Sequence, residues 1–181
     1  MRAREGTARR YAKALYELAH AGGDTEGAGR ELERVTAVLL GDARAHDVLT
    51  RPWIKPEDRR AIAAAIAQKE GARKLVQDFL GLVAERGRGD HLAEIVGAYR
   101  ALVDGEHGRA RAEVRSAVAL TDREKQELSA RLERALGKRI ILEERVDDTL
   151  LGGFVAQVGS LILDGSLDGQ LAQVRQRLAR G

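Results

Sequence analysis

Few side chains in this sequence have the type and spacing that catalysis or metal binding requires. The histidines are His20, His46, His91 and His107. No two of them have the i, i+4 spacing with which a helix presents two imidazoles to a metal ion, and we expect all four on the surface. The chain has no cysteine, which excludes a thiolate metal site and a cysteine nucleophile. We therefore predict no metal site and no cofactor.

Two further motifs resemble catalytic or phosphate-binding elements but lack what those sites need. Asp147 and Asp148 are adjacent carboxylates, and neighbouring residues of an extended segment point to opposite sides, so a connector explains them better than an acid–base pair. Gly152–Gly153 lacks the Lys-Ser/Thr of a P-loop and precedes a predicted strand rather than a helix. The residues alone thus predict a binding protein with no catalytic site.

The first part of the chain, residues 1–105, has the apolar periodicity of helices. Apolar residues recur there at steps of three and four, and the helices end at glycines such as Gly22–Gly23. Thr7 is the expected N-cap of the first helix. Because the predicted connections are short, the pattern indicates an all-α six-helix bundle. The expected helices cover about 7–21, 28–40, 42–49, 56 onward, 72–86 and 91–103.

The only two prolines of the chain mark a corner before the fourth predicted helix. Pro56 suits the first position of that helix, since its ring needs no N–H partner there. We expect Ile62, Ala65 and Ile66 on the buried face of this helix, and Trp53 as a packing anchor at the corner.

The pattern changes after Gly105–Gly108, a flexible hinge by composition, and residues 106–181 predict a small α+β domain. Residues 112–120 alternate as in a half-buried strand. Thr121 and Glu124 form a capping box for a helix that Gly137 ends. Short strands follow at 140–146, 154–158 and 161–163. A last helix is predicted from an apolar stripe made of Leu167, Leu171, Val174 and Leu178.

The charge balance is nearly even. The chain carries 31 Lys+Arg and 28 Asp+Glu, a net charge of +3, and both signs are interleaved. The sequence pI of about 9.4 motivates an alternative, a nucleic-acid-binding regulator, but aromatic residues for base stacking are only 3% of the chain. An enzyme with an uncommon site is a second alternative. No apolar stretch of about 18 residues and no signal-peptide pattern occurs, so we expect a chain that stays in, or faces, the cytosol.

Two segments resemble a known family. The first is residues 8–19, with Tyr-Ala-Lys-Ala at 11–14. The second is residues 146–171, in which Gly152, Gly153, Asp164, Gly165 and Ser166 form the more specific motif. Together they are similar to the delta subunits of bacterial F-type ATP synthases, relatives of the mitochondrial oligomycin-sensitivity-conferring protein. The resemblance covers nearly the whole chain.

This resemblance implies a non-catalytic stator subunit, which joins the catalytic head to the peripheral stalk so that the head does not turn with the rotor. It implies that residues 1–105 bind the N-terminal helices of the alpha subunits and that residues 106–181 bind the b subunits. It implies a place on the cytoplasmic face of the bacterial membrane, with membrane association only through the complex, and no nucleic-acid partner.

The resemblance also implies a groove for an alpha-subunit helix between the first and fifth helices. Its expected residues are Tyr11, Ala14, Leu15, Leu18, Val76, Phe79, Leu80 and Val83. Some of these must face the bundle core instead, and we expect a charge at Phe79 or Leu15 to weaken head binding. The C-terminal stripe of Leu167, Leu171, Val174 and Leu178 has two open roles: it docks a b-subunit helix, or it covers the small sheet.

Overall fold

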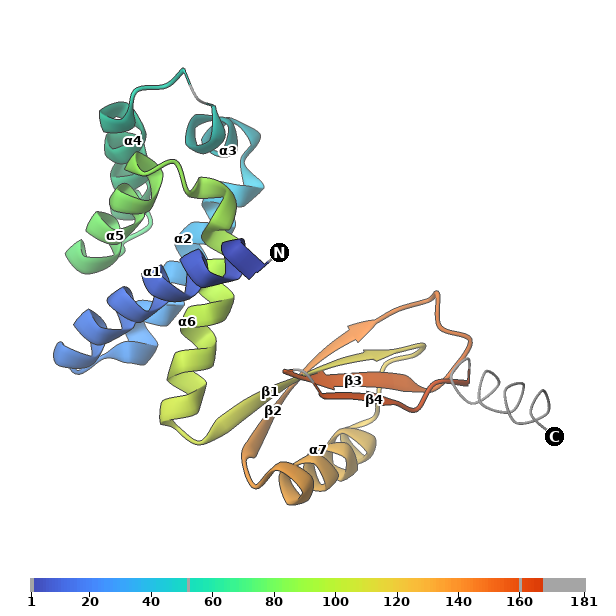
Figure 1. Ribbon diagram of the computed structural model, residues 1–181. Coiled ribbons are helices and arrows are strands. Elements are labelled where there is room, and N and C mark those ends of the chain that lie inside the picture. The colour runs from blue at the N-terminus through green and yellow to red at the C-terminus, as the bar shows by residue number, and fades with distance from the viewer. Residues whose placement is uncertain (1, 52, 160, 168–181) are drawn as a thin grey trace. The chain divides into compact units, whose positions relative to one another are not determined.

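The computed structural model describes residues 2–51, 53–159 and 161–167 (Figure 1). It divides into two compact units, Met1–Val103 and Asp104–Gly181. The first unit is helical, and the second holds a four-stranded sheet with a helix. The expected order, a helical part followed by a small mixed part, is therefore confirmed. None of the described helices is long and apolar enough to cross a membrane.

The first helix begins earlier than predicted. It starts at Arg2, so Thr7 lies inside the helix and does not cap it. The residues before Thr7 are mostly arginine, alanine and glutamate, whose helix propensity exceeds the local preference of threonine for an N-cap. The helices are α1 (Arg2–Ala21), α2 (Thr25–Gly41), α3 (Ala43–Thr50), α4 (Pro56–Lys69), α5 (Lys74–Glu85) and α6 (Leu92–Glu106), with a 3-10 turn at Gly89–His91 before α6.

Local sequence signals set most of the other helix ends. Gly23 takes a positive φ of 75° after α1. Asp42 caps α3, since its Oδ1 accepts hydrogen bonds from the backbone N–H groups of Arg44 at 2.7 Å and Ala45 at 3.1 Å. These backbone N–H groups, Ala45 first, lower the pKa of Asp42. Pro56 opens α4 as predicted.

The predicted buried face of α4 is right for Ile66, which packs against the core, and wrong for Ile62 and Ala65. Ala63 and Ala67 are fully buried, whereas Ile62 is 37% exposed and Ala65 is exposed as well. The reason is a close approach of α5, where a Cβ built on Gly81 would lie 3.8 Å from that of Ala64. Helices this close place small side chains between them.

Trp53 does not anchor the corner before α4. Its side chain is 72% exposed, and its ring lies 5.3 Å from the guanidinium carbon of Arg51. The prediction of a packing role for Trp53 is therefore wrong.

The connection between the units is more ordered in its first half than its composition predicts. Gly105 and Glu106 belong to the last turn of α6, and the chain turns only at Gly108, which has a φ of 61°. Asp104, in the same last turn, accepts a hydrogen bond of 2.6 Å from Nε of Arg111 in the first strand. This ion pair, 6% exposed on the Asp104 side, holds the start of the strand.

The second unit is a sheet in the order β2-β1-β3-β4. The strands β1 and β2 are parallel and α7 connects them, while β3 pairs antiparallel with both β1 and β4. The strand predicted to reach residue 120 ends at Ser116, and Val118 is 72% exposed. The bounds are β1 (Arg109–Ser116), α7 (Asp122–Leu136), β2 (Arg139–Val146), β3 (Phe154–Val158) and β4 (Leu161–Asp164).

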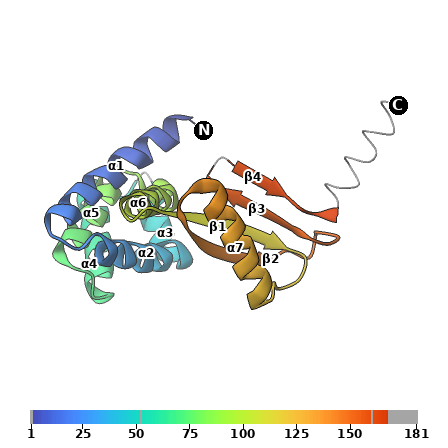
Figure 2. The same ribbon diagram turned by 90° about the horizontal axis from the view of Figure 1, so that it is seen from below.

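The start and end of α7 match the sequence prediction. Thr121 and Glu124 bond each other's backbone N–H groups in a capping box, and Gly137 ends the helix in the left-handed conformation. Leu128 and Leu132 of α7 pack into the buried core of the second unit. In Figure 2, α7 crosses β1 and β2, while β3 and β4 lie beside it.

Candidate partner-binding groove

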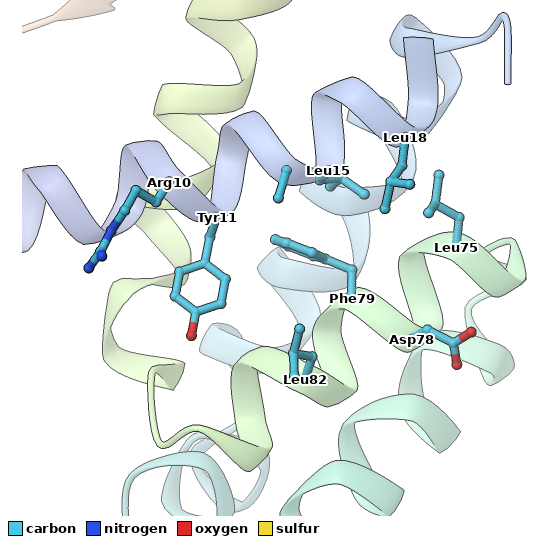
Figure 3. A pocket seen from close by; sticks show the side chains of 9 residues that line it. Arg10, Tyr11, Leu15, Leu18, Leu75, Asp78, Phe79 and Leu82 are labelled. Carbon is cyan, nitrogen blue, oxygen red and sulfur yellow. The ribbon is translucent and has the colours of Figure 1, made fainter. Parts of the chain in front are cut away.

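A groove of about 510 Å³ runs between α1 and α5 on the first unit (Figure 3). Its walls are apolar along most of its length. It is lined by Arg10, Tyr11, Ala14, Leu15 and Leu18 of α1 and by Leu75, Asp78, Phe79 and Leu82 of α5.

Helix α1 divides its residues between the core and this groove. The core side is a row of mostly small residues, since Ala8, Ala12 and Ala19 are nearly or fully buried. The groove side repeats at i, i+3, i+4 and i+7, from Tyr11 to Leu18. Leu15 belongs to both, because it lines the groove floor and is fully buried.

Helix α5 makes the same division. Val76, Leu80 and Val83 are buried in the core and do not line the groove. The groove side is again an i, i+3, i+4, i+7 set, from Leu75 through Asp78 and Phe79 to Leu82. The structure thus brings together five of the eight residues that we expected at the groove: Tyr11, Ala14, Leu15, Leu18 and Phe79.

An aromatic pair spans the groove. The rings of Tyr11 and Phe79 meet edge to face, with centroids 6.4 Å apart and planes at 71° (Figure 3). Beyond this pair, Leu18 is 60% exposed and Leu82 is 38% exposed. Phe79 is only 8% exposed, so its ring lies at the bottom of the groove and not at its edge.

Charged residues lie at the two ends of the groove. Figure 3 shows Arg10 near one end and Asp78 near the other. Asp78 forms an ion pair with Lys74, one turn earlier in α5. The middle of the groove is therefore apolar and the ends are polar, which is the pattern of a surface that receives one face of an amphipathic helix.

The groove lining holds no nucleophile paired with a base. Across the residues that the structure describes, there is also no cluster of three or more histidine, aspartate or glutamate side chains that could hold a metal ion. One histidine prediction is wrong: His91 is 5% exposed, and the 3-10 turn that carries it packs against α3, where a Cβ built on Gly89 would stand 2.6 Å from Cβ of Leu49. Its Nε2 is 3.6 Å from a carboxylate oxygen of Asp90.

Asp147, considered above as part of a carboxylate pair, forms a turn. Its Oδ1 accepts hydrogen bonds from the hydroxyl of Thr149 at 2.5 Å and from the backbone N–H of Thr149 at 3.1 Å. These two bonds, the hydroxyl first, lower the pKa of Asp147. Its Oδ2 lies 3.2 Å from Arg115 in the neighbouring strand. These contacts fix the turn that follows β2, and they agree with the predicted connector rather than with an acid–base pair.

The glycine motif of the second unit joins the ends of β3 and β4. Gly153 has a φ of 78°, and a Cβ built there would stand 2.3 Å from the carbonyl oxygen of Gly165. Asp164 accepts hydrogen bonds from the hydroxyl of Ser166 at 2.6 Å and from its backbone N–H at 2.9 Å, and these bonds lower the pKa of Asp164. Gly165 in turn donates its N–H to the carbonyl of Phe154 at 2.9 Å. The motif residues therefore serve close backbone packing.

The C-terminal stripe is described only at its first residue. Leu167 is 48% exposed. Leu171, Val174 and Leu178 lie outside the described residues.

Sequence reasoning missed four lining residues: Arg10, Leu75, Asp78 and Leu82. Leu75 and Leu82 stand at i−4 and i+3 from Phe79, but the core residues Val76 and Val83 stand at i−3 and i+4, so helical spacing alone does not separate the two sets. The charged residues at the groove ends carry no signal of their own in a chain that is one-third charged.

The fold and the groove define a class: proteins with a helical unit that carries an apolar groove, followed in the chain by a small unit with a four-stranded sheet. Residues 7–178 match the family described as ATP synthase delta (OSCP) subunit. The ATP synthase subunit delta of Syntrophobacter fumaroxidans is 36% identical over 174 residues, 96% of this chain and 95% of that protein. That of Anaeromyxobacter sp. strain Fw109-5 is 40% identical over 171 residues, 94% and 96% of the two chains. A chain in a Toxoplasma gondii mitochondrial ATP synthase structure has a similar fold, with a TM-score of 0.72, 19% identity, and 95% and 97% of the chains covered.

The chain belongs to the ATP synthase delta (OSCP) subunit family. It is a non-catalytic stator subunit of the peripheral stalk of ATP synthase. The resemblance noted in residues 8–19 and 146–171 is thereby confirmed.

Proposed function

We propose that the first unit holds the catalytic head by binding the N-terminal helix of an alpha subunit in the α1–α5 groove. In this proposal α1–α6 act together as one six-helix domain. The observation that carries it is the groove itself: two matched i, i+3, i+4, i+7 stripes flank an apolar floor on an otherwise highly charged chain.

The exposed leucines of the groove support a partner there. Covering the exposed part of Leu18 (60%) would gain about 1–2 kcal/mol and that of Leu82 (38%) about 1 kcal/mol, so a helix seated over both gains part of the free energy that binding needs. The Tyr11–Phe79 pair supplies a rigid aromatic floor that loses little entropy on binding.

The second unit, in the same proposal, binds the b subunits of the stalk. It exposes several apolar side chains: Val118 and Leu151 are both 72% exposed and Val146 is 59% exposed. The whole subunit then lies on the cytoplasmic face of the membrane as a peripheral member of the complex, with no nucleic-acid partner.

The test is a calorimetric titration of the full chain with a synthetic peptide of the cognate alpha-subunit N-terminus. Leu82→Glu should weaken binding by about ten-fold or more, since a charge would stand against the apolar face of the peptide. Leu40→Glu is the matched control, because Leu40 on α2 is 36% exposed against 38% for Leu82 and does not line the groove.

Leu15→Glu is a poor test of this groove because Leu15 is fully buried, so a charge there would disturb the core before it reported on binding. No saturable binding by the unmodified chain, or equal loss in Leu82→Glu and Leu40→Glu, would contradict the proposal.

A further inference from the structure

Arg73, at the start of α5, forms ion pairs with two carboxylates that belong to the beginning of α2. Its Nη1 lies 3.0 Å from Oδ2 of Asp24, which caps the start of α2. Its Nε donates a hydrogen bond of 2.8 Å to Oε1 of Glu31, two turns further along α2. We call Asp24, Glu31 and Arg73 the Arg73 cluster.

Asp24 connects this cluster to the end of α1. Helix α1 ends at Ala21, and only two glycines separate it from Asp24. The backbone N–H of Asp24 donates to the carbonyl of Ala19, in the last turn of α1, at 3.1 Å. Its Oδ1 accepts a hydrogen bond of 2.7 Å from the N–H of Gly27 in α2. Asp24 is therefore fixed against both helices, and Arg73 ties the start of α5 to that point.

Glu31 supplies the cap that α5 does not supply for itself. Arg73 is the N-cap residue of α5, and its own side chain makes no capping hydrogen bond. Instead, Oε2 of Glu31 accepts a hydrogen bond of 2.8 Å from the backbone N–H of Arg73. A carboxylate is favourable there because the N-terminus of a helix carries partial positive charge. The position of α5 therefore depends on a side chain of α2.

A second residue of α2 holds the other side of the turn between α4 and α5. Arg34 follows Glu31 by one turn, and its Nη2 donates a hydrogen bond of 2.9 Å to the carbonyl of Glu70. Glu70 is the C-cap of α4, where a positive charge is favourable. Helix α2 thus presents a base to the end of α4 and an acid to the start of α5, which fixes this turn from both sides.

Apolar contact between the two groove walls is incomplete at the end nearest the cluster. Figure 3 shows Leu18 of α1 and Leu75 of α5 across the groove at that end, while the Tyr11–Phe79 pair lies further along it. Leu18 is exposed and Leu75 only half-buried, so neither side chain is fully packed. The polar contacts of Arg73 therefore join the walls where the apolar contacts leave them apart.

We propose that Asp24, Glu31 and Arg73 are positioning residues, which set the spacing of α1 and α5 at the Leu18–Leu75 end of the groove. The consequence for binding rests on the proposed function: a helix fits the groove tightly only when its walls have the right spacing. Ion pairs as exposed as that of Arg73 with Asp24 contribute little to overall stability. The effect of the cluster should therefore appear in the groove and not in unfolding.

The first measurement is made on the free chain. Nitroxide labels at Glu17→Cys in α1 and Lys74→Cys in α5 report the spacing, because both positions are exposed, neither lines the groove, and the chain has no other cysteine. Arg73→Gln removes the charge and keeps a polar side chain. We expect it to broaden the distribution of label distances, measured by electron paramagnetic resonance, about two-fold or more.

Arg100→Gln is the matched control. Arg100 on α6 forms an ion pair with Glu33 of α2, and its side chain is 35% exposed against 44% for Arg73. This variant also removes an ion pair between α2 and another helix, but not one at the groove. It should leave the label distances unchanged. Equal broadening in both variants, or no broadening in Arg73→Gln, would overturn the proposal.

The second measurement is the affinity of the unlabelled chain for the alpha-subunit N-terminal peptide. Arg73→Gln should weaken binding by about five-fold, and Arg100→Gln should not change it. The midpoints of denaturant unfolding should agree between the two variants. An unchanged affinity in Arg73→Gln, or a midpoint lowered in that variant alone, would overturn the positioning role.

The two measurements also separate this proposal from the function on which it rests. A peptide that fails to bind the unmodified chain would overturn the proposed function. The label distances need no peptide, so they would still decide whether the Arg73 cluster sets the spacing of the two helices.

Discussion

The two units differ in how much apolar core stabilises them. Among the described residues, the first unit buries 22 apolar side chains in one cluster, and the second buries 6. The first unit can therefore devote an outer surface of two core helices to a groove without losing its packing. The second unit has to rely on local devices: a capping box, a close glycine joint and carboxylates that bond backbone N–H groups. The first unit is thus stabilised mainly by its large apolar core, and the second unit mainly by local interactions.

We expect the largest loss of stability from a cavity in the core of the second unit, which is the smaller of the two. Leu132→Ala removes a side chain that is 1% exposed and should lower the stability of the second unit by about 3 kcal/mol. Leu80→Ala, also 1% exposed, is the counterpart in the first unit. Hydrogen exchange should show the whole second unit opening in Leu132→Ala, while the first unit stays protected in Leu80→Ala. Retained protection of the second unit in Leu132→Ala would break the comparison.

The next largest effect is expected at the glycine motif of the second unit, where Gly153 lies against Gly165. Gly153→Ala combines a φ of 78° with a 2.3 Å clash against a backbone oxygen, so the second unit should lose about 2 kcal/mol or more. Gly137→Ala is the control with the same kind of φ, 63°, but nothing within 4 Å of the added Cβ, and should cost only about 1 kcal/mol. Thermal unfolding of the two variants measures the difference. Equal losses would mean that the contact with Gly165 does not matter.

Helix caps give a smaller effect. Thr121→Ala removes the capping box of α7, and Asp42→Ala removes the N-cap of α3. Each should cost about 1 kcal/mol locally. Because α7 is the only described helix of the second unit, the Thr121 variant should increase exchange across that unit, whereas the Asp42 variant should affect α3 alone. An Asp42 variant that opened the whole first unit would contradict the difference in core size.

Acid should act on the second unit first. The carboxyl pKa is lowered at Glu124, Glu144, Asp147 and Asp164 there, and in the first unit at Asp42. A folded pKa below the unfolded value means that the unfolded chain binds more protons as the pH falls. The stabilisation is therefore complete above the unfolded value of about 4 and is lost as the pH falls through the folded pKa.

Exchange measured from pH 6 to pH 3, corrected for intrinsic rates, should show the second unit opening before the first. In Asp164→Asn the pH dependence of the second unit should be weaker. An earlier opening of the first unit would reverse the predicted order.

The fold was largely predictable because glycine, proline and capping signals are local. Pro56, Asp42 and the Thr121–Glu124 pair mark helix starts by bonds made within a few residues. The buried face of α4 was only partly predictable, since it depends on how closely α5 approaches at Gly81. For the same reason the sequence indicated the two groove helices but could not separate Val76, Leu80 and Val83 in the core from Leu75 and Leu82 at the rim.

The most direct test of the central claim, that the head is held in the α1–α5 groove, is protection of a single thiol. Ala14→Cys places a thiol of nearly the original size on an exposed lining residue of a cysteine-free chain, and Ala65→Cys, exposed on α4, is its control. With saturating alpha-subunit N-terminal peptide, alkylation of the thiol at position 14 should slow by about ten-fold or more, while that at position 65 should not change. Unchanged alkylation at position 14 by a bound peptide would contradict the account, because the head would then be held elsewhere.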